Sequence, residues 1–121
     1  MVNQQANRLR HIRIAHLDKA RPVLVLARES ALSAMTKVTV APITSTVKGL
    51  TSELRLGPQN GLDHECVAAL DNTVTISRDA LGKVIGFLLP QQEQLLAKAC
   101  VLAFDLDVPL PAGAGLRRES L

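Results

Sequence analysis

Apolar and polar residues alternate along much of the chain, and this alternation predicts short β-strands. Residues 11–17 (HIRIAHL) and 37–43 (KVTVAPI) repeat with the period of two that puts every second side chain on one face. Residues 23–27 between them form a continuous apolar run, which is typical of a strand covered on both faces. Further strands are predicted at residues 51–56, 65–70, 73–76 and 82–89.

A helical pattern follows from Pro90, and the helix is predicted to extend to about residue 106. Proline suits the first turn of a helix, because its fixed φ matches the helix and its missing N–H would have no partner there. The next apolar residues recur every three or four positions and define one stripe: Leu95, Leu96, Ala99, Leu102, Ala103 and Leu106. These elements predict a mainly β (α+β) fold, a small barrel of five to six antiparallel strands closed by an amphipathic helix. One such sheet is marginally stable alone, which favours a homodimer.

The 121 residues fit one domain, with a flexible leader expected at residues 1–10, the folded domain at 11–107 and a disordered Pro/Gly-rich tail at 108–121. No apolar run approaches the roughly 18 residues of a membrane helix, and the leader lacks the apolar segment of a secretory signal. A cytoplasmic protein without membrane contact is therefore expected. Cys66 and Cys100 follow no metal-binding spacing and are expected to be reduced, mostly buried thiols.

The charges are divided unevenly along the chain. Residues 1–48 hold eight Lys or Arg and two acids, a net charge of +6, whereas residues 49–108 hold four bases and eight acids, a net charge of −4. A basic face attracts a polyanion, although an ordinary surface with a basic N-terminal arm would give the same count. Aromatic residues make up only 2% of the chain, which argues against an aromatic platform for unpaired bases. Any nucleic acid would be bound through phosphates and hydroxyls, by Arg or His.

Several residues are predicted to meet at one edge of the sheet. The strand that follows Arg21 and the strand that precedes Thr44 are consecutive, so antiparallel pairing brings these two residues together. The strand at 51–56 is expected to pair with the strand at 37–43, and the strand at 65–70 to return to the same edge. This edge would carry three cations, three hydroxyls and one carboxylate: Lys19, Arg21, Thr44, Ser45, Thr46, Lys48 and Asp71.

This set of side chains fits a phosphodiester, because Arg presents a planar fork of donors to phosphate oxygens and hydroxyls add short hydrogen bonds. A solvated strand edge whose hydroxyls satisfy turn backbone is the alternative. The sequence has no carboxylate cluster and no His pair at ligand spacing, so a two-metal nuclease is disfavoured and no metal or other cofactor is expected. His11, His16 and His64 are interpreted as ordinary strand or loop histidines. Metal-free cleavage is easiest on RNA, whose own 2′-hydroxyl is the nucleophile.

Four segments carry a resemblance to a known family: RPVLVL at 21–26, APITST at 41–46, KGL at 48–50 and CVAALDN at 66–72. In this order and spacing they resemble the MazF/PemK family of endoribonuclease toxins from type II toxin–antitoxin systems. The resemblance implies an SH3-like barrel that forms a homodimer and binds RNA in grooves across the dimer. It also implies metal-independent, sequence-selective cleavage to 2′,3′-cyclic phosphate and 5′-hydroxyl ends, which inhibits translation and growth. Messenger, ribosomal and transfer RNA all stay open as targets.

The resemblance also assigns roles to single residues. The catalytic Arg of the family falls on Arg21 and its catalytic Thr on Thr44, while an RNA-contacting Lys falls on Lys48. Asp71 matches an acid that serves as base in PemK-like members, but their Arg two positions earlier is Ala69 here, so Asp71 is assigned a supporting role or that of the base. The first loop of this chain, residues 17–20, is shorter than usual in the family and lacks a His found there in PemK-like members. A MazE-like antitoxin with a flexible acidic segment is implied as the partner that covers the basic groove.

Two other functions remain open on the same barrel. A CcdB-like toxin inhibits gyrase through apolar C-terminal residues, whereas this chain ends in LRRESL. A non-catalytic RNA-binding SH3-like module would lose only RNA affinity when Arg21 is removed, with strong salt dependence throughout.

Overall fold

Residues 9–105 are described by a computed structural model, and within them seven strands form one sheet, where five to six were predicted. The predicted tail, 108–121, and all but the last two residues of the predicted leader lie outside this range. No helix of the described part is long and apolar enough to cross a membrane. The elements are β1 (Arg10–His16), β2 (Ala20–Arg28), α2 (Glu29–Leu32), β3 (Lys37–Thr44), β4 (Glu53–Leu56), η1 (Pro58–Asn60), β5 (Cys66–Ala69), η2 (Leu70–Asn72), β6 (Val74–Ser77), η3 (Arg78–Ala80), β7 (Leu81–Phe87), η4 (Pro90–Gln92) and α3 (Glu93–Ala103).

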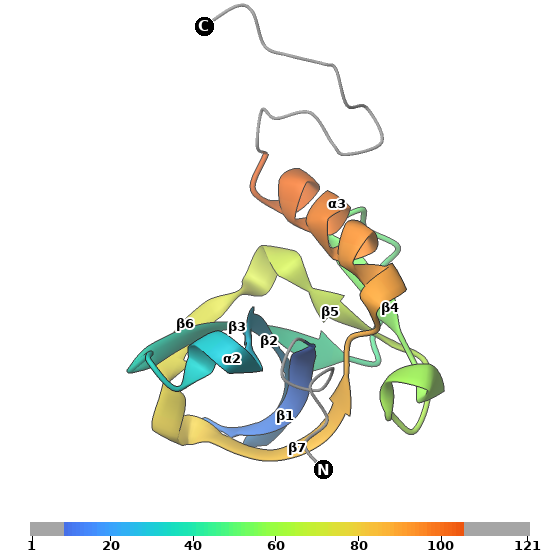
Figure 1. Ribbon diagram of the computed structural model, residues 1–121. Helices are drawn as coiled ribbons and strands as arrows, with labels where there is room; N and C mark the ends of the chain where they lie inside the picture. The colour runs from blue at the N-terminus through green and yellow to red at the C-terminus, as the bar shows by residue number, and fades with distance from the viewer. Residues whose placement is uncertain (1–8, 106–121) are drawn as a thin grey trace, which may run out of the picture.

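The strands pair antiparallel in the order β4-β5-β3-β2-β1-β7, and β6 pairs with β3 outside this path. β3 changes partner along its length, since Val38 lies opposite Ile76 of β6 whereas Thr44 lies opposite Val67 of β5. The 3-10 turn η2 between β5 and β6 accommodates this change. Figure 1 shows the strands curled around one another, with α3 at one end beside β4 and β5. The sheet therefore forms the expected small barrel.

The prediction that the strand at 51–56 pairs with the strand at 37–43 is wrong. β4 pairs with β5, with Leu54 opposite Ala68, and β5 lies between β4 and β3. All four residues of β5 are buried, as a central strand requires, whereas β4 buries Leu54 and Leu56 and exposes Arg55, as an edge strand does. The long connection 45–52 lets the chain skip one strand position.

Two apolar clusters occupy opposite faces of the strands. One cluster lies under α3 and includes Leu24, Ala41, Ala68 and Leu96, and the other includes Val23, Val25, Val38, Val40 and, from α2, Leu32. Both faces of β2 are thus covered, as its continuous apolar run predicted.

The predicted apolar stripe of the helix is only partly buried. Leu96 and Ala99 are in the core, but Leu95 is 54% exposed and Leu102 is 45% exposed. Ala103 ends α3, earlier than predicted, and Leu106 lies outside the described residues. The buried part of the stripe is narrower than the spacing predicted, because α3 contacts the end of the barrel along only one side.

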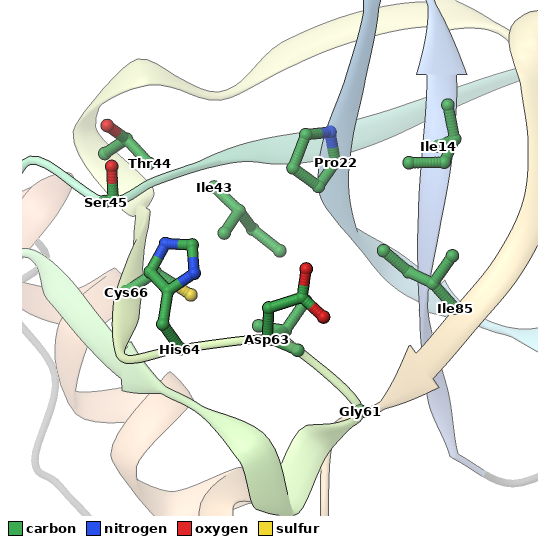
Figure 2. Close-up of a pocket in the computed structure, with 11 residues that line it drawn as sticks. Ile14, Pro22, Ile43, Thr44, Ser45, Gly61, Asp63, His64, Cys66 and Ile85 are labelled. Atoms are coloured by element: carbon green, nitrogen blue, oxygen red, sulfur yellow. The ribbon is translucent and has the colours of Figure 1, made fainter.

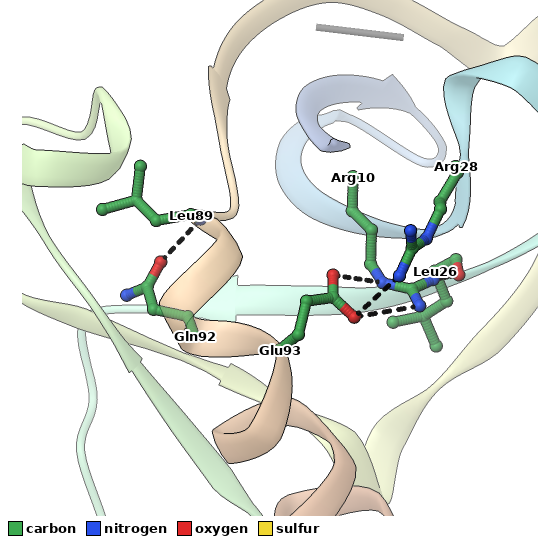
Figure 3. Close-up of polar contacts among 6 residues, drawn as sticks. All are labelled: Arg10, Leu26, Arg28, Leu89, Gln92 and Glu93. Atoms are coloured by element: carbon green, nitrogen blue, oxygen red, sulfur yellow. Dashed lines mark hydrogen bonds and ion pairs between the residues drawn. The ribbon is translucent and has the colours of Figure 1, made fainter. Parts of the chain in front are cut away.

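An ion-pair network fixes the start of α3 to the barrel (Figure 3). The Glu93 carboxylate accepts hydrogen bonds from Arg10 Nε at 2.9 Å and Arg10 Nη2 at 3.2 Å, and from Arg28 Nη2 at 3.4 Å. Arg10 Nη1 also donates to the carbonyl of Leu26. These contacts tie the helix to β1 and β2, far from it in sequence.

Candidate functional site

The open end of the β2–β3 pair holds the two residues that the sequence singled out. The two strands pair with Val25 opposite Val40 and Val23 opposite Pro42, and two more residues in the same register would put Arg21 opposite Thr44. Directly opposed residues of an antiparallel pair share one face of the sheet. Extended in this way, the register would put Arg21 and Thr44 on one face of neighbouring strands, two residues beyond the last paired residues, Val23 and Pro42.

The hydroxyl of Thr44 is oriented by its own backbone turn. The backbone N–H of Thr46 donates to Thr44 Oγ1 at 3.0 Å. Because this contact uses a lone pair of the oxygen, the hydroxyl proton is left to donate to another group. Thr44 is half-buried at the end of β3, so its hydroxyl is positioned and accessible.

Arg21 is exposed and lies beside an acid of the shortened first turn. Its Nε contacts Asp18 Oδ1 at 3.5 Å. The hydrogen bond from Arg21, followed by one from the backbone N–H of Lys19, lowers the pKa of the Asp18 carboxyl. A guanidinium has five N–H donors, so Arg21 keeps donors for a phosphate while Asp18 limits its motion. The sequence interpretation treated Asp18 as part of a turn and missed this contact.

A cavity of about 330 Å³, here called the loop cavity, gathers four of the seven predicted site residues. Asp71 reaches it from η2, where β3 changes partner, and Thr46 and Lys48 reach it from the connection 45–52. Ser45 lines a different cavity, and neither Lys19 nor Arg21 lines either one. The loop cavity is lined by Pro42, Thr44, Thr46, Lys48, Leu50, Glu53, Ala69, Asp71 and Asn72.

Glu53 holds the loop that carries Lys48. Its carboxylate accepts hydrogen bonds from three successive backbone N–H groups, those of Lys48 at 3.1 Å, Gly49 at 2.9 Å and Leu50 at 3.1 Å. Desolvation alone would raise the pKa of Glu53, but these hydrogen bonds outweigh it and lower the pKa. Sequence reasoning missed Glu53, because only the three-dimensional course of the loop brings the three N–H groups together.

A larger cavity, of about 560 Å³, is also lined by Thr44, and we call it the isoleucine cavity (Figure 2). Figure 2 shows the side chains of Asp63 and His64 directed from the loop 57–65 into this cavity. Nothing in the sequence pattern distinguished His64 from an ordinary loop histidine. The cavity is lined by Ile14, Pro22, Ile43, Thr44, Ser45, Gly61, Leu62, Asp63, His64, Cys66 and Ile85.

Both cysteines are free thiols, as predicted, with Cys66 buried and Cys100 half-buried. Within residues 9–105, no three side chains of His, Cys, Asp or Glu lie close enough together to hold a metal ion.

Comparison with known proteins identifies relatives along nearly all of the described chain. Residues 9–104 match the family model of the PemK-like, MazF-like toxins of type II toxin–antitoxin systems. Endoribonuclease MazF3 of Mycobacterium tuberculosis H37Rv is 54% identical over 99 residues, which cover 82% of this chain and 96% of that protein.

Solved structures agree with the sequence match. The Mycobacterium tuberculosis toxin MazF-mt6 superposes with a TM-score of 0.77 at 54% identity, over 81% of this chain and 99% of that one. A mycobacterial endoribonuclease solved with its cognate antitoxin has a TM-score of 0.70 at 22% identity, over 82% of this chain and 95% of that one, and shows a common fold. The chain thus belongs to the PemK-like, MazF-like family of toxins of type II toxin–antitoxin systems.

Proposed function

We propose that this endoribonuclease toxin cleaves RNA without a metal ion, with the scissile phosphate held between Arg21 and Thr44. The observation that carries the proposal is the register of β2 and β3, which, extended by two residues to the strand ends, would oppose a guanidinium and a hydroxyl on one face of the sheet. Each group contacts at least one neighbour that orients it, Asp18 for Arg21 and the N–H of Thr46 for Thr44.

The chemistry is a transesterification within the RNA. The 2′-oxygen attacks phosphorus as the bond to the 5′-oxygen breaks, which leaves a 2′,3′-cyclic phosphate and a 5′-hydroxyl. Arg21 and the Thr44 hydroxyl donate to the non-bridging oxygens, whose charge grows in the transition state. Asp71 in the loop cavity accepts the 2′-hydroxyl proton, and solvent at this open edge protonates the departing 5′-oxygen. Lys19, Ser45, Thr46 and Lys48 bind the flanking phosphates and riboses.

The same residues define the partners of the proposed function. RNA is the substrate, and an acidic segment of a MazE-like antitoxin would neutralise the cations of this edge and occupy it in place of RNA. A homodimer would cover apolar side chains that a single copy leaves exposed, including Leu50, Leu95 and Leu102. The cytoplasm, where RNA is translated, is the proposed location.

The decisive experiment compares single-residue variants on a short single-stranded RNA. Arg21→Ala is expected to lower the cleavage rate by about a hundredfold or more, the typical cost of losing one donor to a developing oxyanion. Thr44→Val keeps the shape without the hydroxyl and should also cleave slowly. Arg55→Ala, in an exposed arginine of edge strand β4, is the matched control and should cleave normally.

Two further observations separate the mechanism from its alternatives. A substrate with 2′-deoxyribose at the cleaved nucleotide should resist, and a chelator should leave the rate unchanged. Inhibition by the chelator would refute the metal-free step. If Arg21→Ala weakened RNA binding and wild-type protein cut nothing, the chain would be a non-catalytic RNA-binding module; capture of gyrase without RNA cleavage would favour the CcdB-like function.

A further inference from the structure

Two short turns of similar sequence, PQN in η1 and PQQ in η4, face each other at the start of α3. Each turn begins with proline and ends with an amide side chain. In η1, the backbone N–H of Gly57 donates to Asn60 Oδ1 at 3.2 Å. In η4, the backbone N–H of Leu89 donates to Gln92 Oε1 at 2.9 Å. The same local hydrogen bond therefore orients the amide at the end of each turn.

The two amide side chains are also bonded to each other in the interior. Asn60 is 2% exposed and Gln92 is 6% exposed. Asn60 Nδ2 donates to Gln92 Oε1 at 2.6 Å, and Gln92 Nε2 donates to Asn60 Oδ1 at 3.4 Å. Asn60 Nδ2 also donates to the carbonyl of Phe87, the last residue of β7, at 2.9 Å. Because a buried amide without partners is costly, the two turns hold each other in one arrangement.

Two glycines allow the loop 57–65 to pack directly on β7. Gly61 has a φ of +91°, and a Cβ at this position would lie 2.5 Å from the carbonyl oxygen of Ile85. A Cβ on Gly86 would lie 1.7 Å from the carbonyl oxygen of Asn60. Backbone therefore packs on backbone, and the first half of the loop is built into the barrel next to η4.

Gln92 is also the N-cap residue of α3, but its side chain makes no capping hydrogen bond to the helix. N-cap side chains usually accept a hydrogen bond from an N–H of the first helical turn. The amide of Gln92 is instead bonded to Asn60 and Leu89, while the next residue, Glu93, binds Arg10. Figure 3 shows the side chains of Gln92 and Glu93 directed apart. The start of α3 is thus held by two separate sets of contacts, one to the loop and one to the barrel.

The segment joined in this way reaches a functional surface at each end. α3 exposes Leu95 and Leu102, which the proposed homodimer would cover. The far part of the loop 57–65 lines the isoleucine cavity, as does Thr44 (Figure 2). Contiguous segments that share buried hydrogen bonds commonly open together, as one cooperative unit.

We propose that α3 and the loop 57–65 open and close as one cooperative unit through the Asn60–Gln92 pair, so that whatever holds α3 in place also sets the mobility of the loop beside Thr44. The link to activity rests on the proposed function, which places Thr44 at the scissile phosphate. The coupling itself requires neither RNA nor cleavage and is measured without them.

Native-state hydrogen exchange, followed by NMR on the full chain, tests the cooperative unit in the wild-type protein. The reporters in the loop are the N–H groups of Gly61 and Leu62, which are hydrogen-bonded within the loop. The reporters in α3 are the N–H groups of residues 97–100. At low denaturant concentration both sets should exchange with the same free energy of opening, and this should be lower than that of β2 and β3.

A variant without the amide pair tests the role of Gln92. Gln92→Ala should speed exchange at Gly61 and Leu62 by about tenfold relative to β2 and β3, which corresponds to about 1.4 kcal/mol. Gln91→Ala, in the exposed neighbouring amide of η4, is the matched control and should leave the rates unchanged.

A second variant perturbs α3 from the barrel side. Glu93→Gln weakens the contacts of α3 with Arg10 and Arg28. Exchange in the loop should nevertheless rise by about threefold, because α3 and the loop open together. This rise should disappear when Gln92→Ala is also present, since the connection is then broken.

Faster exchange in α3 of Glu93→Gln with an unchanged loop would overturn the inference, as would different opening free energies for the loop and α3 in wild type. It would also be wrong if Gln92→Ala sped up β2 and β3 as much as the loop, because the whole domain would then open at once. Cleavage assays decide the proposed function separately: if wild-type protein cuts no RNA, the coupling stands and only its link to activity is lost.

Discussion

Asn60 is buried and hydrogen-bonds to Gly57, Phe87 and Gln92, and replacing it by alanine tests whether these hydrogen bonds stabilise the fold. The change removes the acceptor of the Gly57 N–H and the side-chain donor to the Phe87 carbonyl. Gln92 Oε1 keeps its contact with the N–H of Leu89, 2.9 Å away, so it is not left unpaired. A buried polar group without a partner costs about 1–3 kcal/mol, and two such groups give an expected loss of about 2–6 kcal/mol.

Thermal unfolding followed by circular dichroism measures this loss. For a domain of this size, a loss of about 1 kcal/mol lowers the melting temperature by about 4–8 °C, so Asn60→Ala should unfold about 8 °C or more below wild type. Gln94→Ala, an exposed amide on α3, is the control and should change stability by less than about 0.5 kcal/mol. A double-mutant cycle with Gln92→Ala should show coupling, because the two side chains share a hydrogen bond of 2.6 Å. Equal melting temperatures for Asn60→Ala and Gln94→Ala would refute this reasoning.

Three further predictions concern the loops and the thiols. Glu53→Gln should weaken RNA binding, because it loosens the loop 45–52. In wild type, hydrogen bonds lower the pKa of Glu53 in the folded state, so the stability that this carboxylate contributes is complete above its ordinary pKa of 4.5 and is lost as the pH falls below that value. Unfolding measured from pH 7 to pH 3 should therefore show a steeper loss of stability in wild type than in the variant. Gly86→Ala should destabilise the protein by about 1–3 kcal/mol or more, because the added Cβ would collide with the carbonyl of Asn60, and denaturant unfolding would measure it. Cys66 and Cys100 should react with iodoacetamide at pH 8 more slowly than in unfolded chain, because burial raises the pKa of both thiols; equal rates by mass spectrometry would contradict this.

The sequence predicts local features of this fold well, because they depend on neighbouring residues. Each predicted strand is present, and Pro90 opens the helical segment. The antiparallel pairing of β2 with β3 was predictable because these strands are consecutive, for which antiparallel pairing is the default.

The sequence-based predictions fail where segments far apart in the chain could occupy the same place in the sheet. β5 displaced β4 as the partner of β3 because four buried residues need cover on both faces, and the alternation of β4 alone could not show this. The contacts of Asp18 and Glu53 were missed for a related reason: each depends on the course of a loop, and the residue types at turns indicate that a loop exists without fixing where its side chains point.

The two prolines at the open end of β2 and β3 connect the fold to the proposed chemistry. Pro42 cannot donate, so its pair with Val23 must be of the type that exchanges no hydrogen bonds. The next pair would then be the bonded one, and it would need an N–H from Pro22, which has none. The ladder must weaken at this point, one residue before Arg21 and Thr44. Pro22 and Ile43 line the isoleucine cavity there, and Thr44, the last residue of β3, lines both this cavity and the loop cavity. Interruption of the ladder thus leaves β2 and β3 unpaired beside Thr44, where the two cavities meet and where the proposed function requires access for a phosphate.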